Sequence, residues 1–286
     1  MALKQRQLAR RVIGVARRSE TIPQAIELGA IDEGGLDPLA AVSEADLVIL
    51  ATPVLQMAGL LRAIAPALPA GCIISDAGSS KADITSVADS LGLGEFVGGH
   101  PMAGSEKKGV DYARADLFVG ATYFLTPTVH TDGDAVSRVA QLVQGLGALP
   151  VVLSPERHDR IVAVTSHLPH LLAASLMKLI LNETTRDPLT GKGMATGLRD
   201  VTRTTSGDVE MWRDVYVSNR GRLLEALESF GAVCAEVRAL LEKGEASAIA
   251  EWLAGAKRFR EEVYGSQPSA SGPPEGQQDR PRRTSR

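Results

Sequence analysis

Short apolar segments alternate with helical segments through the first half of the chain, and this alternation restricts the fold more than any other feature. Residues 47–51 and 72–76 are continuous apolar runs, and each precedes a segment with helical periodicity. Strands alternating with helices at this spacing are typical of a parallel sheet covered on both faces. We therefore predict a doubly wound α/β domain over residues 1–153, with strands at 12–15, 47–51, 72–76, 96–97, 123–125 and 151–153.

The pattern becomes entirely helical after Ser154. Ser154 and Pro155 have the residue types of a helix N-cap and first turn, and Pro169 should kink the long helix that follows. A later helix carries an apolar seam of Leu223, Leu227, Phe230, Cys234, Val237 and Leu241. We predict a helical domain over 154–264 whose seam forms a dimer interface or packs within the chain, and a disordered tail over 265–286.

Composition restricts the class of protein. The 286 residues are 44% hydrophobic and 23% charged with a formal net charge of −3, which argues against nucleic-acid binding. Apolar stretches are interrupted before the length of a membrane span, and no apolar segment follows the charged first residues as in a signal peptide. Cys72 and Cys234 lie in apolar surroundings, so we expect reduced core thiols in a cytoplasmic protein with no metal site.

The segment Gly98-Gly99-His100-Pro101 holds the first candidate for chemistry. It follows the apolar residues 96–97, and we expect a short buried strand that ends in Gly-Gly-His, with a bend that brings the imidazole to the open end of the sheet, where ligands of α/β folds bind. Histidine exchanges protons near neutral pH. A carboxylate, Glu106, follows a small-residue turn. A histidine satisfied within a tight loop is the plainer interpretation of this residue alone.

Other polar residues occur at predicted helix starts and turns. Two serines begin the helix after residue 76, where free backbone N–H groups favour an anion or cofactor, although serine is also a common N-cap. Two histidines three residues apart share a helix face but also fit as buried, hydrogen-bonded residues. An arginine ahead of a tryptophan suits a carboxylate or a surface ion pair. These residues are Ser79, Ser80, Asp159, His167, His170, Arg203 and Trp212.

Four ordered motifs carry a resemblance to a known family. They are Asp76-Ala77-Gly78-Ser79-Ser80-Lys81, Gly98-Gly99-His100-Pro101-Met102-Ala103-Gly104-Ser105-Glu106, Ser166-His167-Leu168-Pro169-His170, and Asp200-Val201-Thr202-Arg203 continuing to Asp208–Asp214. Residues 1–264 closely resemble the prephenate/arogenate dehydrogenase family of tyrosine biosynthesis. The resemblance implies a Rossmann-like domain, a helical dimerisation domain, a homodimer, and oxidative decarboxylation of prephenate or arogenate with hydride transfer to NAD(P).

The resemblance also implies residue roles. His100 would accept a hydrogen bond from the substrate 4-hydroxyl, so it must be neutral, and activity should fall as pH drops through its pKa. Ser79 would bridge His100, this hydroxyl and the nicotinamide, and Arg203 would bind the ring carboxylate. The remaining substrate-binding residues would be Asp159, His167 and His170 on the kinked helix, with Glu106 and Trp212 at the pocket wall.

The cofactor is predicted from the end of the strand at 12–15. NAD enzymes usually carry an acidic residue there, whereas this chain has Ala16 followed by Arg17 and Arg18. Two guanidinium groups suit a 2′-phosphate, which favours NADP, and NAD stays possible if both are solvated. Thr52, Pro53 and Ser79 are further cofactor-site candidates.

One departure from the family pattern concerns the Gly-x-Gly-x-x-Gly turn that cradles a pyrophosphate. The sequence contains no such turn, and residues 2–8 resemble the second half of the helix that follows it. The missing strand would lie between those at 12–15 and 47–51, so we expect an interrupted sheet. Either the natural chain starts upstream, or this is a non-catalytic, dimer-forming relative. A dehydrogenase of 3-hydroxy acids is a third possibility, disfavoured by the His100 and Arg203 motifs.

Overall fold

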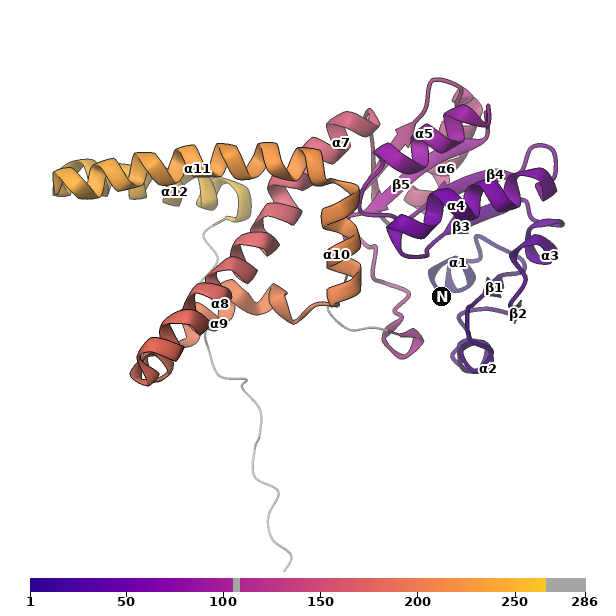
Figure 1. Ribbon diagram of the computed structural model, residues 1–286. Helices are drawn as coiled ribbons and strands as arrows, with labels where there is room; N and C mark the ends of the chain where they lie inside the picture. The colour runs from indigo at the N-terminus through magenta and orange to yellow at the C-terminus, as the bar shows by residue number, and fades with distance from the viewer. Residues whose placement is uncertain (105–108, 266–286) are drawn as a thin grey trace, which may run out of the picture. The chain divides into compact units, whose positions relative to one another are not determined.

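The computed structural model describes residues 1–104 and 109–265, in two compact units, Met1–Glu228 and Ser229–Arg286. Its first part is an α/β domain (Figure 1). The strands are β1 (Ile13–Val15), β2 (Glu33–Gly35), β3 (Leu47–Leu50), β4 (Ile73–Asp76), β5 (Phe96–Pro101), β6 (Thr122–Pro127) and β7 (Leu149–Val152). The helices are α1 (Ala2–Gln5), α2 (Thr21–Glu27), α3 (Pro38–Val42), α4 (Val54–Ile64), α5 (Ala82–Ser90) and α6 (Gly133–Gly145), with 3-10 turns η1 (Ala65–Ala67) and η2 (Val110–Tyr112).

The strands form two separate sheets, in agreement with the predicted interruption of the sheet. β1 and β2 pair with each other, and the second sheet has the order β3-β4-β5-β6-β7. The α/β class is confirmed, but β6 runs antiparallel to β5, which the sequence analysis did not predict. A parallel neighbour needs a crossover, commonly a helix, and the described part of the β5–β6 connection contains only the short turn η2.

The five-stranded sheet is covered on both faces. Ile74 and Phe96 belong to one apolar cluster with residues of α4 and α5. Ile73 and Val97, their neighbours in sequence, belong to the opposite cluster with α6 (Figure 1). This alternation follows from the two-residue period of strands. The prediction that strand 47–51 is fully buried is wrong, because β3 lies at the sheet edge and leaves Ile49 39% exposed.

Two glycines allow β5 to pack closely against its surroundings. A Cβ on Gly98 would lie 2.2 Å from Thr126 Oγ1, and one on Gly99 would lie 2.4 Å from the Asp76 carbonyl oxygen. Only residues without a side chain fit here. The predicted strand through Gly-Gly-His is confirmed, but β5 continues to Pro101 without the expected bend, and His100 is a strand residue paired with Phe124.

The helical part begins as predicted, with the Ser154 hydroxyl accepting a hydrogen bond from Arg157 N and Pro155 in the first turn. α7 (Pro155–Val162) passes through the π-helical turn η3 (Ala163–His167) into α8 (Leu168–Arg186). Pro169 has no N–H to continue the regular ladder, which accounts for an irregular turn directly before it. The remaining elements are η4 (Pro188–Gly193), α9 (Thr196–Thr202), η5 (Arg203–Ser206), α10 (Val209–Ser218), α11 (Arg220–Lys243) and α12 (Ala246–Tyr264).

Pro155–Arg186 is long and apolar enough, by length and composition alone, to cross a membrane. The expectation that no stretch reaches this length is therefore wrong. Core helices of globular proteins pass the same test. This stretch carries His158 and Asp159, which are buried and hydrogen-bonded to residues of the α/β domain.

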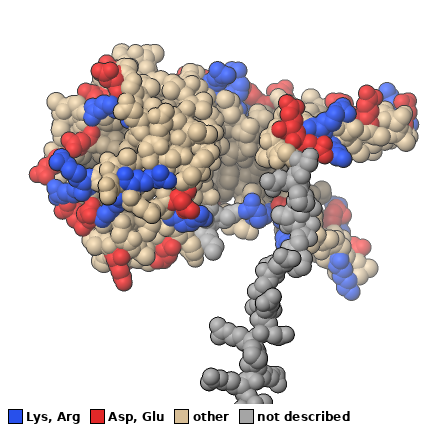
Figure 2. Space-filling model, turned by 180° about the vertical axis from the view of Figure 1, so that it is seen from behind, with Lys and Arg blue, Asp and Glu red and all other residues tan. Residues whose placement is uncertain are grey.

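The predicted seam lies on α11. Leu223 is buried, whereas Leu241 is 62% exposed. Phe230, Val237 and Trp252 line an apolar hollow between α11 and α12. Cys72 is buried and Cys234 is exposed, so the second thiol is not in a core as expected, and neither is in a disulfide. Acidic and basic side chains are interspersed over the face shown in Figure 2.

Candidate functional site

His100 is a buried imidazole near the end of β5. Its Nδ1 lies 2.8 Å from His158 Nε2, and the two rings meet edge to face. Burial lowers the pKa of His100 well below its ordinary value, and the neighbouring His158, Lys81 and His167 lower it further. His100 is therefore neutral at pH 7, as a hydrogen-bond acceptor must be.

Asp159 connects the helical part to the α/β domain. Its Oδ1 accepts a hydrogen bond from Lys81 N at 2.8 Å, and its Oδ2 accepts one from Ala82 N at 2.9 Å. The carboxylate thus caps the N-terminus of α5, where a negative charge is favourable. His158 Nδ1 lies 2.7 Å from the same Oδ1. The cap of α5 is therefore this carboxylate, and neither Ser79 nor Ser80 fills that place.

Lys81 lies beneath the site, with no part of its side chain exposed. Its ammonium group pairs with Asp76 and donates a hydrogen bond to the Gly99 carbonyl oxygen at 2.8 Å. The Asp76 carboxylate also accepts hydrogen bonds from Gly78 N and Gly99 N. Burial lowers the pKa of Lys81, and Asp76 opposes that shift. This pair joins the end of β4 to β5 at Gly99, the residue before His100.

Asn219 fixes the orientation of His167. Its Nδ2 donates to the Asp159 backbone carbonyl at 2.8 Å and lies 3.1 Å from His167 Nδ1. A carbonyl only accepts, so the amide nitrogen is oriented correctly, and His167 Nδ1 is an acceptor. His167 Nε2 then carries the hydrogen and has no partner within the described residues. Burial lowers the pKa of His167 to about 4, so this N–H is a neutral, buried donor available to a ligand.

An aromatic stack borders His167. The rings of His170 and Trp212 are parallel, with centroids 3.6 Å apart, and His170 Nδ1 lies 2.6 Å from the Tyr216 hydroxyl. The backbone of Thr204 hydrogen-bonds with His170 and raises its pKa, whereas burial lowers that pKa more strongly. Arg203, the neighbour of Thr204, is an exposed residue where α9 meets η5.

Five of the predicted site residues lie in one network of contacts, and the others lie apart from it or outside the described residues. Contacts join His100, Asp159, His167, His170 and Trp212 into one network. Asp159 is 2% exposed, and both of its carboxylate oxygens accept hydrogen bonds from backbone N–H groups. Ser79 is half-buried, and its hydroxyl makes no hydrogen bond to a described residue; its neighbour Ser80 donates to Ser218 Oγ at 2.8 Å. Glu106 lies outside the described residues.

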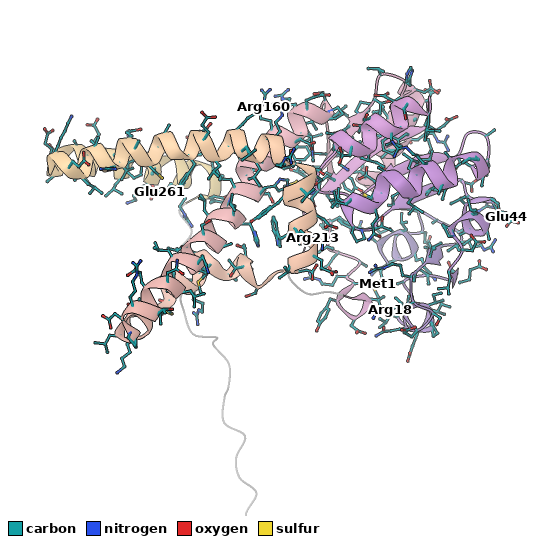
Figure 3. The ribbon with its side chains drawn as sticks, in the orientation of Figure 1. Met1, Arg18, Glu44, Arg160, Arg213 and Glu261 are labelled. Carbon is teal, nitrogen blue, oxygen red and sulfur yellow. The ribbon has the colours of Figure 1, made fainter. Side chains whose placement is uncertain are left out.

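The predicted cofactor residues lie at the ends of two strands. Arg17 and Arg18 are exposed beyond β1, where Figure 3 labels Arg18. Thr52 and Pro53 follow β3, and the buried Thr52 Oγ1 has no hydrogen-bond partner among the residues described. An unsatisfied hydroxyl at the carboxyl end of a parallel strand fits a bound nucleotide.

Sequence reasoning missed three members of this network. His158 was overlooked beside Asp159, although a histidine in the first turn of a capped helix was a usable signal. Asn219 and Tyr216 lie after Trp212, and nothing in their spacing marks them. Their roles depend on α10 packing beside the kinked helix, which the sequence pattern does not specify.

Two family models match consecutive parts of the chain. Residues 1–152 match the nucleotide-binding domain of prephenate dehydrogenase, and residues 154–255 match its dimerization domain. Together they cover most of the sequence.

Similar proteins agree with these models. Prephenate dehydrogenase of Bacillus subtilis is 36% identical over 264 residues, which are 91% of this chain and 71% of that protein. Cyclohexadienyl dehydrogenase of Zymomonas mobilis is 34% identical over 77% of this chain and 76% of its own length. The crystal structure of A. aeolicus prephenate dehydrogenase with hydroxyphenyl propionate and NAD+ has a TM-score of 0.86 and 30% identity, covering 92% of each chain. Synechocystis arogenate dehydrogenase gives 0.80 and 30%, covering 92% of this chain and 94% of that one. The chain therefore belongs to the prephenate dehydrogenase family.

Proposed function

We propose that this chain catalyses the oxidative decarboxylation of prephenate or arogenate in tyrosine biosynthesis. The hydrogen on C4 of the ring leaves as hydride to NAD(P), and the 4-hydroxyl gives up its proton. Loss of the ring carboxylate as carbon dioxide leaves its electron pair in the ring, which becomes an aromatic phenolate and takes a proton back. The observation that carries this proposal is His100, a buried and neutral imidazole whose Nε2 has no hydrogen bond to a described residue. Such a group accepts the hydroxyl proton.

The other residues of the site would hold the substrate. Arg203 would bind the ring carboxylate through two parallel hydrogen bonds. His167 Nε2–H supplies a further donor, and Trp212, stacked on His170, supplies a flat apolar wall. Ser79 would bridge His100 and the substrate hydroxyl, and Glu106 would lie at the pocket wall.

The nucleotide would lie along the carboxyl ends of β1, β3 and β4. Arg17 and Arg18 would bind a 2′-phosphate, which supports NADP over NAD. Thr52 Oγ1, Pro53 and Ser79 would border the nicotinamide half. When bound, this cofactor supplies the hydride acceptor, and the protein positions the substrate C4 against it.

An assay of reduced-cofactor formation tests the function. The purified chain is offered prephenate and arogenate separately, each with NADP and with NAD. We expect turnover that is faster with NADP at equal concentration. Faster turnover with NAD would overturn the cofactor preference. Folded protein with no turnover on any pair would contradict the activity and favour the non-catalytic alternative.

Replacement of Arg203 with alanine is expected to raise KM for the substrate about 10²-fold, with a smaller effect on kcat. Loss of charge-assisted hydrogen bonds worth about 3 kcal/mol gives this factor. Arg203→Lys keeps the charge without the planar fork and should be intermediate. Arg199→Ala, at an exposed arginine four residues earlier on α9, is the matched control. An Arg203→Ala enzyme with wild-type KM would exclude this role.

We also propose that the chain acts as a cytoplasmic homodimer. Exposed apolar side chains include Leu179 and Leu181 on α8 and Leu253 and Phe259 on α12, as expected for surfaces covered by a second copy. The free thiols Cys72 and Cys234 suit a reducing compartment. Sedimentation at twice the mass of one chain would support the dimer, and sedimentation at the mass of one chain would contradict it.

A further inference from the structure

Three side chains form an unbroken line of hydrogen bonds that ends at the proposed base. The Asp159 carboxylate contacts His158 Nδ1 at 2.7 Å, and His158 Nε2 contacts His100 Nδ1 at 2.8 Å. None of the three residues is more than 8% exposed, and His158 is completely buried. His158 itself has no place in the proposed substrate contacts. Its position between a carboxylate and the base therefore needs an explanation.

The Asp159 carboxylate, at one end of this line, determines which atom donates in each hydrogen bond. Both Asp159 oxygens accept hydrogen bonds from backbone N–H groups at the start of α5, a place that favours the ionised carboxylate. An ionised carboxylate only accepts, so His158 Nδ1 carries a hydrogen. In the tautomer with its hydrogen on Nδ1, the His158 imidazole has a bare Nε2, which accepts from His100 Nδ1–H. The remaining nitrogen of His100, Nε2, is left without a hydrogen.

We infer that His158, held by Asp159, is a positioning residue that fixes His100 in the tautomer able to accept a proton at Nε2. The inference rests on the proposed function for its catalytic meaning, whereas the tautomer itself is a property of the protein alone. Without His158, either ring nitrogen of His100 can carry the hydrogen, and the form protonated at Nε2 cannot act as base.

The same line stabilises the charge that the reaction creates. When the substrate hydroxyl gives its proton to His100 Nε2, the ring becomes an imidazolium with hydrogens on both nitrogens. His100 Nδ1–H continues to donate to His158, and His158 continues to donate to the Asp159 carboxylate. The positive charge is thus connected to the Asp159 carboxylate in a site where burial and Lys81 disfavour the imidazolium. The proton stays on His100 until it leaves for solvent or product.

Nitrogen-15 NMR of histidine-labelled protein tests the tautomer without substrate or cofactor. The chain has only five histidines, so each signal can be assigned by its loss in a single His→Gln variant. We expect His100 of the wild-type protein to be protonated at Nδ1 and bare at Nε2. Protonation at Nε2 would overturn the inference, whether or not the protein turns over. This outcome therefore differs from a failure of the proposed function, which would leave the tautomer intact.

Variants of His158 test the consequence for the reaction. His158→Phe keeps a ring but removes the acceptor, and we expect kcat to fall roughly 10- to 100-fold with KM nearly unchanged, together with an Nε2-protonated signal from His100. His158→Gln places a carboxamide oxygen near the position of Nε2 and should recover much of the loss. The control is His130→Gln, an exposed histidine outside the site.

The pattern of effects separates positioning from packing. A His158→Phe protein that retains wild-type kcat would contradict the inference, as would equal losses in the Phe and Gln variants. If the Phe variant fails to fold, the Gln variant and the wild-type NMR spectrum still decide the result.

Discussion

Replacement of His100 with alanine is expected to lower kcat by roughly 10²- to 10⁴-fold, the usual contribution of a general base. Among residues 1–104 and 109–265 the imidazole contacts no carboxylate directly, and its one hydrogen bond there is with His158. Alanine leaves the hydroxyl proton without an acceptor, whereas the substrate carboxylate contact is unaffected. KM should therefore change much less than kcat. The measurement is steady-state kinetics with whichever substrate the wild-type chain accepts.

The pH profile of the wild-type enzyme gives a second measurement of the same residue. The pKa of His100 lies well below its ordinary value, chiefly because of burial and further because of His158, Lys81 and His167, so the neutral form persists into acid. Activity should be lost only as pH falls through this lowered pKa, and the acid limb of kcat/KM should lie below pH 6.5, the ordinary pKa of histidine. His130→Ala, at an exposed position, is the control. A His100→Ala enzyme with near-normal kcat would remove His100 from the mechanism.

Replacement of Lys81 with methionine is expected to destabilise the fold by about 3–5 kcal/mol. Lys81 and Asp76 are both fully buried, so methionine would leave the Asp76 carboxylate in the interior without its partner. Two backbone N–H groups still bind that carboxylate but carry no full charge. Chemical denaturation followed by circular dichroism measures the loss.

Two further variants separate charge from volume. Lys81→Met combined with Asp76→Asn removes both charges and should recover part of the lost stability. Lys257→Met breaks only an exposed ion pair with Glu261 and should change stability by less than about 1 kcal/mol. A Lys81→Met protein that unfolds at the wild-type denaturant concentration would show that Asp76 is not left uncompensated.

Sequence patterns predicted the positions of helices and strands better than the pairing and direction of the strands. The apolar runs and helix periods located β3, β4 and α4–α6, because these signals are local. The direction of β6 and the exposure of Ile49 depend on which strands become neighbours, and the length of an apolar run does not contain that information. A bend was expected at His100 because Gly-Gly usually marks a turn, whereas here these glycines allow close strand packing.

The residues of the site were predicted better than the contacts between them. His100, His167, His170 and Trp212 do lie in one network, but their identification came from motifs rather than from physical pattern. Asp159 was assigned to the substrate, and no sequence pattern indicated that its carboxylate also binds backbone N–H groups 77 and 78 residues earlier in the chain. Contacts over such separations depend on tertiary packing. His158 was missed for the same reason.

The π-helical turn η3 determines the directions, around the helix axis, in which the side chains after it point. A regular α-helix advances about 100° per residue, so the nine residues from His158 to His167 would place these side chains on opposite sides. A π turn takes up one extra residue and reduces this angular offset by about 100°. His167 and His170 are thereby rotated toward the side that carries His158 and Asp159. One irregular turn, next to one proline, thus allows a single helix to present both halves of the site to the same pocket.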